Sequence, residues 1–182
     1  LIAKNKGLKP KAIIPVDLFG LPADYKIIEA VAKENNLFIL EDTAQGFGGE
    51  INSGRAGSFG HIAATSFFPA KPLGCYGDGG AIFTNEDELN IIMKSVRVHG
   101  GGIDKYDNVR MGLNGRLDTL QAAILLEKLD IFPEEVIRRN RVADYYSKYL
   151  PSQFKKPFTP VGYKSSWAQY SIIAKSNDMR MK

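Results

Sequence analysis

The sequence predicts an α/β fold, because short apolar runs typical of buried strands alternate with segments of helical periodicity. Residues 12–16 and 37–40 are two such runs. Residues 24–36 between them place apolar side chains at helical spacing after Asp24, a residue type that caps helices. A strand, a helix and a strand in this order predict a parallel βαβ unit. The expected architecture is a mixed, mostly parallel sheet flanked by helices.

The next part of the chain continues this alternation. Strands are predicted over residues 61–68 and 81–84, with Gly-rich loops at 46–60 and 72–80. A helix capped by Thr84 or Asn85 should run to about residue 98, and the polar loop at 100–112 is long enough to be functional. A strong helix is predicted over 117–129, and Pro133 should begin a separate helix that runs to residue 150.

The last part of the chain predicts the entry to a second domain. We expect residues 1–130 to form part of a large domain, and residues 131–182 to form a linking helix and the start of a smaller C-terminal α+β domain. Residues 167–174 are predicted to be a strand, but no partner strand follows, and an isolated strand is not stable. We therefore expect that the N- and C-terminal parts of the full protein are absent from these 182 residues.

Composition favours a soluble enzyme or binding protein over other classes. The chain is 44% hydrophobic and 24% charged, as is typical of globular domains. Its net charge of +4 comes without a long Lys/Arg run, so a nucleic-acid partner is not expected. No apolar run approaches the length of a membrane helix, so no membrane partner is expected either. The single cysteine, Cys75, cannot form a disulfide within the chain and favours a cytoplasmic protein.

Lys71 lies in the stretch most suggestive of chemistry. It follows Ser66, at the end of a strand-like run, by five residues, and it stands between Ala70 and Pro72 in an apolar, Gly-rich loop. Such surroundings desolvate an ammonium and favour the neutral amine, which can attack a carbonyl. From this residue alone, a surface lysine with an apolar stem is an equal alternative.

Other polar residues stand where ligands bind in α/β proteins. Asp42 directly follows a buried strand and could face a cationic ligand beyond the end of the sheet, although a helix cap or turn former is the alternative. Gln45 is three residues further on, and Arg116 precedes a strong helix and suits a phosphate or a carboxylate. Cys75 and the two histidines lack metal-ligand spacing, so no metal site is predicted.

Taken together, these residues resemble the DegT-type sugar aminotransferases, which have the fold-type-I architecture of pyridoxal-phosphate (PLP) enzymes. The resemblance covers most of the chain from residue 12 to residue 150, and the order and spacing of its motifs make it specific. The motifs are Val16-Asp17-Leu18-Phe19-Gly20, Glu41-Asp42-Thr43-Ala44-Gln45, Gly57-Ser58-Phe59-Gly60, residues 66–74, Gly77-Asp78-Gly79-Gly80-Ala81, Arg97-Val98-His99-Gly100 and residues 114–123. Thr43 and Gly115 depart from the residues common in the family.

The resemblance implies a role for each of the residues at the predicted site. Lys71 would carry PLP as a Schiff base and move the proton during transamination. Asp42 would pair with the pyridine nitrogen, Gln45 would lie near the ring hydroxyl, and Ser66 would bind the cofactor phosphate. Family members also have an N-terminal portion and a C-terminal domain that this sequence lacks.

The resemblance also implies a homodimer with shared active sites. Asn114 would reach the phosphate of the neighbouring subunit's cofactor, and Arg116 and Tyr76 are weaker candidates for the substrate side. The sequence around Lys71 looks most like enzymes that aminate C3 of a UDP-linked 3-keto-N-acetylglucosaminuronate, taking the amino group from glutamate in the synthesis of bacterial surface polysaccharides such as O-antigen lipopolysaccharide.

Three alternatives stay open at this point. One is an aminotransferase for a 4-keto-6-deoxy nucleotide sugar. Another is a related dehydratase, in which histidine replaces the Schiff-base lysine, and Lys71 argues against it. The third is a non-catalytic nucleotide-binding α/β domain, but residues 17–22 after the first strand lack the Gly-rich phosphate loop that it needs.

Overall fold

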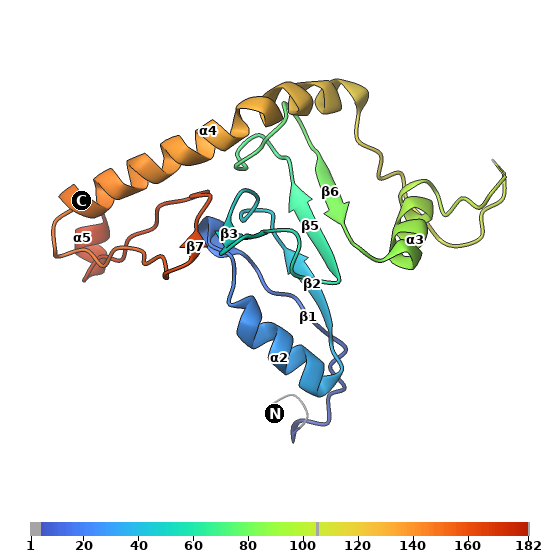
Figure 1. Cartoon of the computed structure of the whole chain (residues 1–182), viewed down its shortest axis with the longest axis horizontal. Helices are drawn as coiled ribbons and strands as arrows, with labels where there is room; N and C mark the ends of the chain where they lie inside the picture. The colour runs from blue at the N-terminus through green and yellow to red at the C-terminus, as the bar shows by residue number, and fades with distance from the viewer. Residues whose placement is uncertain (1–4, 105, 182) are drawn as a thin grey trace.

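A four-stranded sheet forms the centre of the computed structural model, which describes residues 5–104 and 106–181. The strands follow the order β1-β2-β5-β6, with bounds Ala12–Ile13, Phe38–Asp42, Ile62–Ser66 and Gly80–Phe83 (Figure 1). Strands β1, β2 and β5 are parallel, and β6 is antiparallel to β5. The predicted mixed, mostly parallel sheet is confirmed.

Helix α2, Tyr25–Asn35, connects the parallel strands β1 and β2. It begins where predicted, because the Asp24 carboxylate accepts a hydrogen bond of 3.2 Å from the Ile27 N–H. It ends at Asn36, whose left-handed φ of 52° turns the chain so that the Leu37 N–H reaches the Ala32 carbonyl at 2.9 Å. The predicted βαβ unit is therefore confirmed, and it brings the carboxyl ends of β1 and β2 to the same edge of the sheet.

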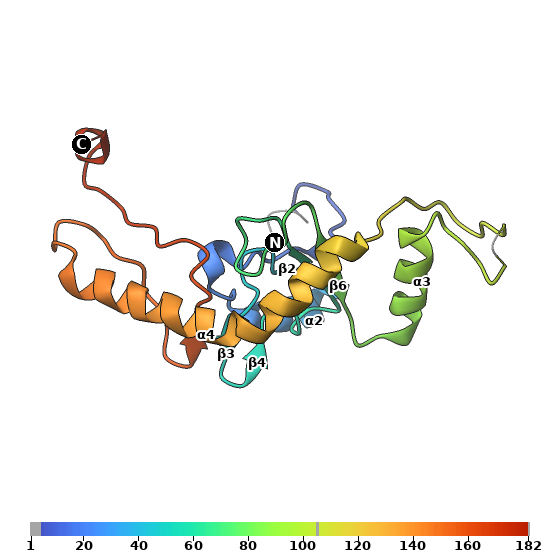
Figure 2. The same cartoon turned by 90° about the horizontal axis from the view of Figure 1, so that it is seen from above.

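Helix α3, Asp87–Arg97, stands beside the sheet beyond β6 and buries none of its residues (Figure 1). Figure 2 shows it at the opposite end of the molecule from α5, Asn177–Met181. Its N-cap is Glu86, so the prediction of Thr84 or Asn85 is wrong. The Thr84 hydroxyl instead donates to the His61 carbonyl (2.8 Å) and accepts the Glu86 N–H (3.1 Å), so it ties the end of β6 to the start of β5.

Helix α4, Thr119–Tyr149, is one continuous helix of 31 residues, which corresponds to about 46 Å (Figure 1). The prediction that Pro133 separates two helices is wrong, because Pro133 lies inside α4. A proline inside a helix costs about 3 kcal/mol, since it removes one hydrogen bond and crowds the preceding turn. Packing on both sides of Pro133 offsets this cost, because a fully buried large apolar side chain contributes about 1.5–3 kcal/mol. The buried residues of α4 are Leu125, Phe132, Val136 and Ala143.

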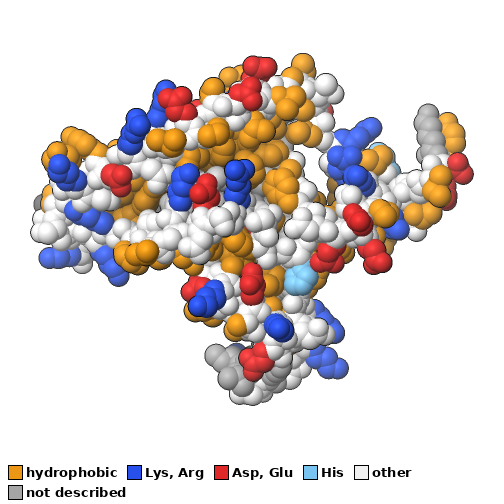
Figure 3. Space-filling model, viewed as in Figure 1, with side chains coloured by type: hydrophobic (Ala, Val, Ile, Leu, Met, Phe, Trp, Pro, Cys, Tyr) orange, Lys and Arg blue, Asp and Glu red, His pale blue; other side chains and the backbone are white. Residues whose placement is uncertain are grey.

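The hydrophobic core lies between α4 and the sheet. Its buried members are Phe67, Leu73, Cys75, Leu125, Phe132 and Val136. Phe47 joins them from the loop after β2, and its ring stacks on Phe132 with a centroid distance of 5.6 Å. Gly48 permits this approach, because a Cβ there would lie 2.8 Å from Phe132 and 3.1 Å from Val136. Figure 3 shows hydrophobic side chains gathered below α4 and over the adjoining part of the sheet.

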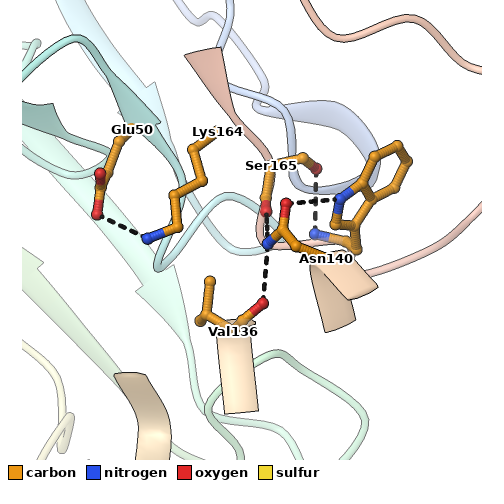
Figure 4. A network of polar contacts seen from close by, with 6 residues as sticks. Glu50, Val136, Asn140, Lys164 and Ser165 are labelled. Carbon is orange, nitrogen blue, oxygen red and sulfur yellow. Dashed lines mark hydrogen bonds and ion pairs between the residues drawn. The ribbon is translucent and has the colours of Figure 1, made fainter. Parts of the chain in front are cut away.

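The C-terminal segment contributes a strand to a second, three-stranded sheet. This sheet has the order β4-β3-β7, with bounds Gly54–Arg55, Glu50–Ile51 and Tyr163–Lys164, and it is antiparallel throughout. Glu50 and Lys164, which are paired in the register, also form an ion pair of 3.3 Å (Figure 4). Strand β3 is therefore one of the elements that connect the C-terminal segment to the rest of the fold.

The strand predicted over residues 167–174 does not form. Trp167 has a left-handed φ of 48°, which breaks the extended conformation at the start of the segment. Within this segment only Ile173 takes part in a β-bridge, with Lys155. The β-prone composition of the segment did not reveal this turn, because the turn is stabilised by contacts with distant parts of the chain.

The described residues hold no helix that combines the length and the apolar character needed to cross a membrane.

Candidate active site at the carboxyl edge of the sheet

Asp42 and Ser66 end two neighbouring parallel strands, β2 and β5. Asp42 is paired with Ala64, so the side chains of Asp42, Ala64 and Ser66 lie on the same, half-buried face of the sheet. From strand spacing and rise, the Cα atoms of Asp42 and Ser66 are about 8 Å apart. The sheet therefore brings a carboxylate and a hydroxyl together at the edge where α/β proteins bind ligands.

The position of Asp42 is fixed through its own main chain. Its N–H donates to the Pro15 carbonyl (2.9 Å), and its carbonyl accepts the Asp17 N–H (3.0 Å). One carboxylate oxygen accepts the Ala44 N–H at 3.1 Å, which makes the turn that ends the strand. Asp42 thus has the turn-forming role considered from the sequence, and its carboxyl group is held at the edge of the sheet.

Gln45 is held at both its side chain and its main chain. Its side-chain oxygen accepts the Phe19 N–H at 2.7 Å. Phe19 lies in a short 3-10 turn, Leu18–Gly20, and has a left-handed φ of 60°. The main-chain carbonyl of Gln45 accepts the hydroxyl of Ser166, a fully buried residue of the C-terminal segment, at 2.8 Å. With its oxygen occupied, the amide of Gln45 presents its NH₂ group for other contacts.

Glu41, which is fully buried, connects two of the sequence motifs. Its carboxylate accepts the N–H groups of Gly57 (2.5 Å), Phe59 (2.9 Å) and Gly60 (3.2 Å). Hydrogen bonds to charged groups contribute about 1.5–3 kcal/mol each, so this carboxylate organises the loop before β5. The strand that carries Asp42 and the strand that carries Ser66 are thereby tied together on the opposite face.

Asp17 is a second fully buried carboxylate on the buried side of the sheet. One of its oxygens accepts the Ala23 N–H (3.0 Å) and the Tyr25 hydroxyl (2.9 Å). Its other oxygen and the hydroxyl of Thr43 are buried without a hydrogen-bond partner of normal geometry. Burial raises the pKa of Asp17 above its usual value of 3.8, the hydrogen bonds oppose this shift, and the nearby charge of Glu41 adds to it, so that the pKa is about 6.

The loop of residues 67–77, here called the Lys71 loop, leaves the sheet directly after Ser66. Its two ends are joined, because the Phe67 carbonyl accepts the Cys75 N–H (2.8 Å) and the Cys75 thiol (3.0 Å). The Lys71 N–H donates to the Phe68 carbonyl at 2.8 Å, and the lysine is half-buried. The loop therefore returns over the same edge of the sheet that carries Asp42 and Ser66.

The remaining predicted residues lie away from this edge or at its margin. Asn114 pairs with Val98 after α3, and its side-chain oxygen accepts the Arg116 Nε–H at 3.0 Å. Both residues are exposed. Tyr76 is 75% exposed at the end of the Lys71 loop. The structure thus brings Asp42, Gln45, Ser66 and the Lys71 loop together at one edge of the sheet. Asn114 and Arg116 are bonded to each other and lie apart from this group.

The chemistry of the grouped residues fits the cofactor that the resemblance implies. A half-buried lysine provides an amine, Asp42 a carboxylate suited to a protonated ring nitrogen, and Ser66 a hydroxyl suited to a phosphate. In contrast, no group of three or more His, Cys, Asp or Glu side chains among the described residues could hold a metal ion.

Comparison with known proteins identifies the family of the chain. The profile of the DegT/DnrJ/EryC1/StrS aminotransferase family matches residues 2–182. The chain belongs to this family. A Pseudomonas aeruginosa relative, UDP-2-acetamido-2-deoxy-3-oxo-D-glucuronate aminotransferase, is 48% identical over 165 residues, which cover 90% of this chain and 46% of the relative.

Two crystal structures show the same fold. An aminotransferase of this family from Brucella abortus is 54% identical, with a TM-score of 0.94, and the match covers 97% of this chain and 48% of that one. DesV from S. venezuelae, in complex with a ketimine intermediate, is 34% identical, with a TM-score of 0.88 and coverage of 97% and 48%. The chain therefore spans about half the length of these relatives, and its fold is that of fold-type-I PLP aminotransferases.

Sequence reasoning missed three residues that support the site in this DegT-family chain. Asp17 and Glu41 are fully buried and stand inside the quoted motifs, but the hydrogen-bond partners of their carboxylates lie up to 19 residues away. Ser166 lies 121 residues from Gln45. The only local signal was the charge of Asp17 and Glu41 beside apolar strands, where an unpaired carboxylate would be costly.

Proposed function

We propose that the full-length protein catalyses the PLP-dependent transfer of an amino group to a nucleotide-linked keto-sugar. The observation that carries this proposal is the position of the Lys71 loop, which leaves β5 at the edge where Asp42 ends β2, in a chain matched along residues 2–182 by an aminotransferase family. Bound PLP supplies the electron sink that an amino-group transfer requires.

In this proposal Lys71 holds the cofactor covalently and then moves protons at its amine. Asp42 pairs with the ring nitrogen and keeps it protonated. The hydroxyl of Ser66 already accepts the Phe68 N–H at 3.2 Å, so its own proton is available to a phosphate oxygen. The amide oxygen of Gln45 is occupied by Phe19, so its NH₂ group can donate to the ring hydroxyl oxygen.

We further propose a homodimer in which Asn114 contacts the phosphate of the partner's cofactor. Its exposure, and its location at the end of α3 away from the sheet, are what this role requires. Arg116, which is bonded to Asn114, and Tyr76 are proposed for the substrate side. The division into residues 1–130 and 131–182 is also kept as a proposal, with α4 running across the boundary.

For the substrate, we propose a UDP-linked 3-keto-N-acetylglucosaminuronate, with glutamate as the amino donor. The support is the name of the Pseudomonas relative and its 48% identity over 90% of this chain. The proposed setting is the cytoplasmic synthesis of amino sugars for a bacterial surface polysaccharide such as O-antigen.

The test begins with the cofactor. Full-length protein should bind PLP with a visible absorption band, and borohydride reduction followed by peptide mapping should find the label on Lys71. Lys71→Ala should keep the fold and lose the label, and Lys33→Ala, in the exposed part of α2, is the matched control. Label on a different lysine would refute the assignment. Mass spectrometry of incubations with UDP- or dTDP-linked keto-sugars and glutamate then identifies the sugar.

A further inference from the structure

One face of α4 binds the main chain of the Lys71 loop directly. The side-chain oxygen of Gln121 accepts the Tyr76 N–H at 2.8 Å. About two helical turns further along, the Lys128 ammonium donates a hydrogen bond to the Gly74 carbonyl. The same ammonium lies 5.7 Å from the centre of the Tyr76 ring. Both contacts engage the segment of the loop that follows Lys71.

Arg139 continues the same set of contacts. Its guanidinium donates to the Pro72 carbonyl and to the Trp167 carbonyl, each at 3.4 Å. Pro72 directly follows Lys71, and Trp167 belongs to the C-terminal segment that also supports Gln45 through Ser166. Arg139 thus connects the residue beside Lys71 to the support of a second site residue.

The three side chains lie in one stripe along the helix. Gln121 and Lys128 are seven residues apart, and Lys128 and Arg139 eleven, so each step is close to a whole number of turns at 3.6 residues per turn. Their partners in the loop, Tyr76, Gly74 and Pro72, are every second residue. A regular stripe that meets alternate residues of one loop is an organised contact between the helix and the extended chain.

Apolar packing holds the same loop against α4 but does not determine where the lysine amine lies. Leu73 and Cys75 are buried in the core below the helix. The Lys71 side chain has several rotatable bonds, so the location of its amine depends on where the main chain beside it is fixed. A displacement of about 1 Å can cost about a hundredfold in rate at a reacting group.

We propose that Gln121, Lys128 and Arg139 are positioning residues that place Lys71 for reaction with the cofactor. This inference rests on the proposed function of Lys71. The three side chains act through the main chain of residues 72–76 and do not touch the reacting atoms. Removing one of these hydrogen bonds should slow the attachment of the cofactor more than it unfolds the protein.

The decisive test compares two acidic replacements that differ only in reach. In full-length protein, Gln121→Glu keeps an acceptor for the Tyr76 N–H, and Gln121→Asp is too short by one methylene. The rate at which cofactor-free protein attaches PLP to Lys71 is followed by absorbance and by borohydride labelling. We expect Gln121→Glu to stay within about twofold of the parent and Gln121→Asp to be about tenfold slower, the loss of one hydrogen bond.

Two further pairs have controls on the same helix. Lys128→Met should slow attachment, and Lys148→Met, an exposed lysine of α4, should not. Arg139→Gln should slow it, and Arg138→Gln, which removes an exposed ion pair with Glu134, should not. If Gln121→Asp does not fold, these two pairs still test whether contacts from α4 set the rate of PLP attachment.

The outcomes separate the two levels of the argument. Labelled Lys71 in the parent, with equal attachment rates within every pair, would overturn the positioning role and leave the proposed function intact. Absence of label on Lys71 in the parent would overturn both. The inference is supported when Gln121→Asp, Lys128→Met and Arg139→Gln attach PLP more slowly than their controls and unfold at temperatures close to those of the controls.

Discussion

The hydroxyl of Ser166 donates a hydrogen bond of 2.8 Å to the main-chain carbonyl of Gln45, although the two residues are 121 positions apart. The Ser166 N–H also donates to the Gly20 carbonyl at 2.9 Å. Gly20 has a φ of 103°, and a Cβ there would lie 2.6 Å from the Ser166 hydroxyl. The C-terminal segment is therefore packed directly against the turn that orients the Gln45 side chain.

Removing the Ser166 hydroxyl should destabilise the candidate site through the main chain of Gln45. We predict that Ser166→Ala lowers the free energy of unfolding by about 1 kcal/mol, because the half-buried Gln45 carbonyl loses its side-chain partner. PLP affinity should fall as well, since the main chain of Gln45 loses one of the two hydrogen bonds that hold this residue. Denaturant unfolding and cofactor titration of full-length protein measure the two effects. Ser147→Ala, an exposed hydroxyl of α4, is the control, and equal values for the two variants would contradict the prediction.

Replacing Asp42 should impair chemistry more than binding. We predict that Asp42→Ala retains PLP but reduces transamination by at least about two orders of magnitude, as expected when a charge-stabilising group is removed. Asp24→Ala, which removes a carboxylate that only caps α2, should cost about 1 kcal/mol of stability and leave turnover unchanged. Near-normal turnover in Asp42→Ala would refute the proposed ring contact.

The raised pKa of Asp17 predicts a specific dependence of stability on pH. A carboxyl group with a pKa of 3.8 in the unfolded chain and about 6 in the native protein binds its proton more tightly when folded. Its contribution is therefore most favourable below pH 3.8 and is lost as pH rises to about 6. The full loss corresponds to about 3 kcal/mol, from 1.36 kcal/mol per pKa unit.

Asp17→Asn removes this titration and keeps an oxygen for the Ala23 N–H and the Tyr25 hydroxyl. We predict that the unfolding free energy of Asp17→Asn, relative to the parent, increases by up to about 3 kcal/mol between pH 4 and pH 7. Denaturant unfolding across this range measures the difference, in which other titrating groups cancel. A difference that is independent of pH would show that Asp17 does not titrate there.

The dimer proposal predicts complementation between inactive subunits. Lys71→Ala and Asn114→Ala proteins should each have little activity, and subunit exchange should restore part of it. In a mixed dimer, one of the two sites contains both an intact Lys71 and an intact partner Asn114. Activity that stays absent after exchange is demonstrated by mass would mean that each site is built within one chain.

The sequence allowed the local parts of the fold to be predicted. The helix after Asp24, the parallel strands and the place of Asp42 at a strand end follow from periodicity and caps, and they are confirmed. Pro133 was misjudged because its local penalty is opposed by burial of Phe132 and Val136, which only the tertiary structure provides. The left-handed turn at Trp167 was missed for a related reason. Its indole N–H bonds to Asn140, which also binds the Ser165 carbonyl (Figure 4).

The roles of the candidate site residues stay predictions, but their grouping has a physical basis. The carboxyl ends of adjacent parallel strands lie at the same edge of a sheet. Asp42 and Ser66 are therefore neighbours at this edge without a direct contact between their side chains. The supporting residues could not be found in the same way. Asp17, Glu41 and Ser166 act through burial and long-range hydrogen bonds, and neither property has a periodic signature in the sequence.

The missing side chain at Gly48 sets the clearance between α4 and the sheet, since Phe132 and Val136 occupy the space that a Cβ would fill. A methyl group at this position would push α4 away from the sheet. Gln121, Lys128 and Arg139 all reach the Lys71 loop from that helix, so one added carbon would lengthen all of these bonds at once. We therefore expect a side chain at residue 48 to disturb the Lys71 loop through α4, in addition to the strain that its φ of 92° imposes on any residue but glycine.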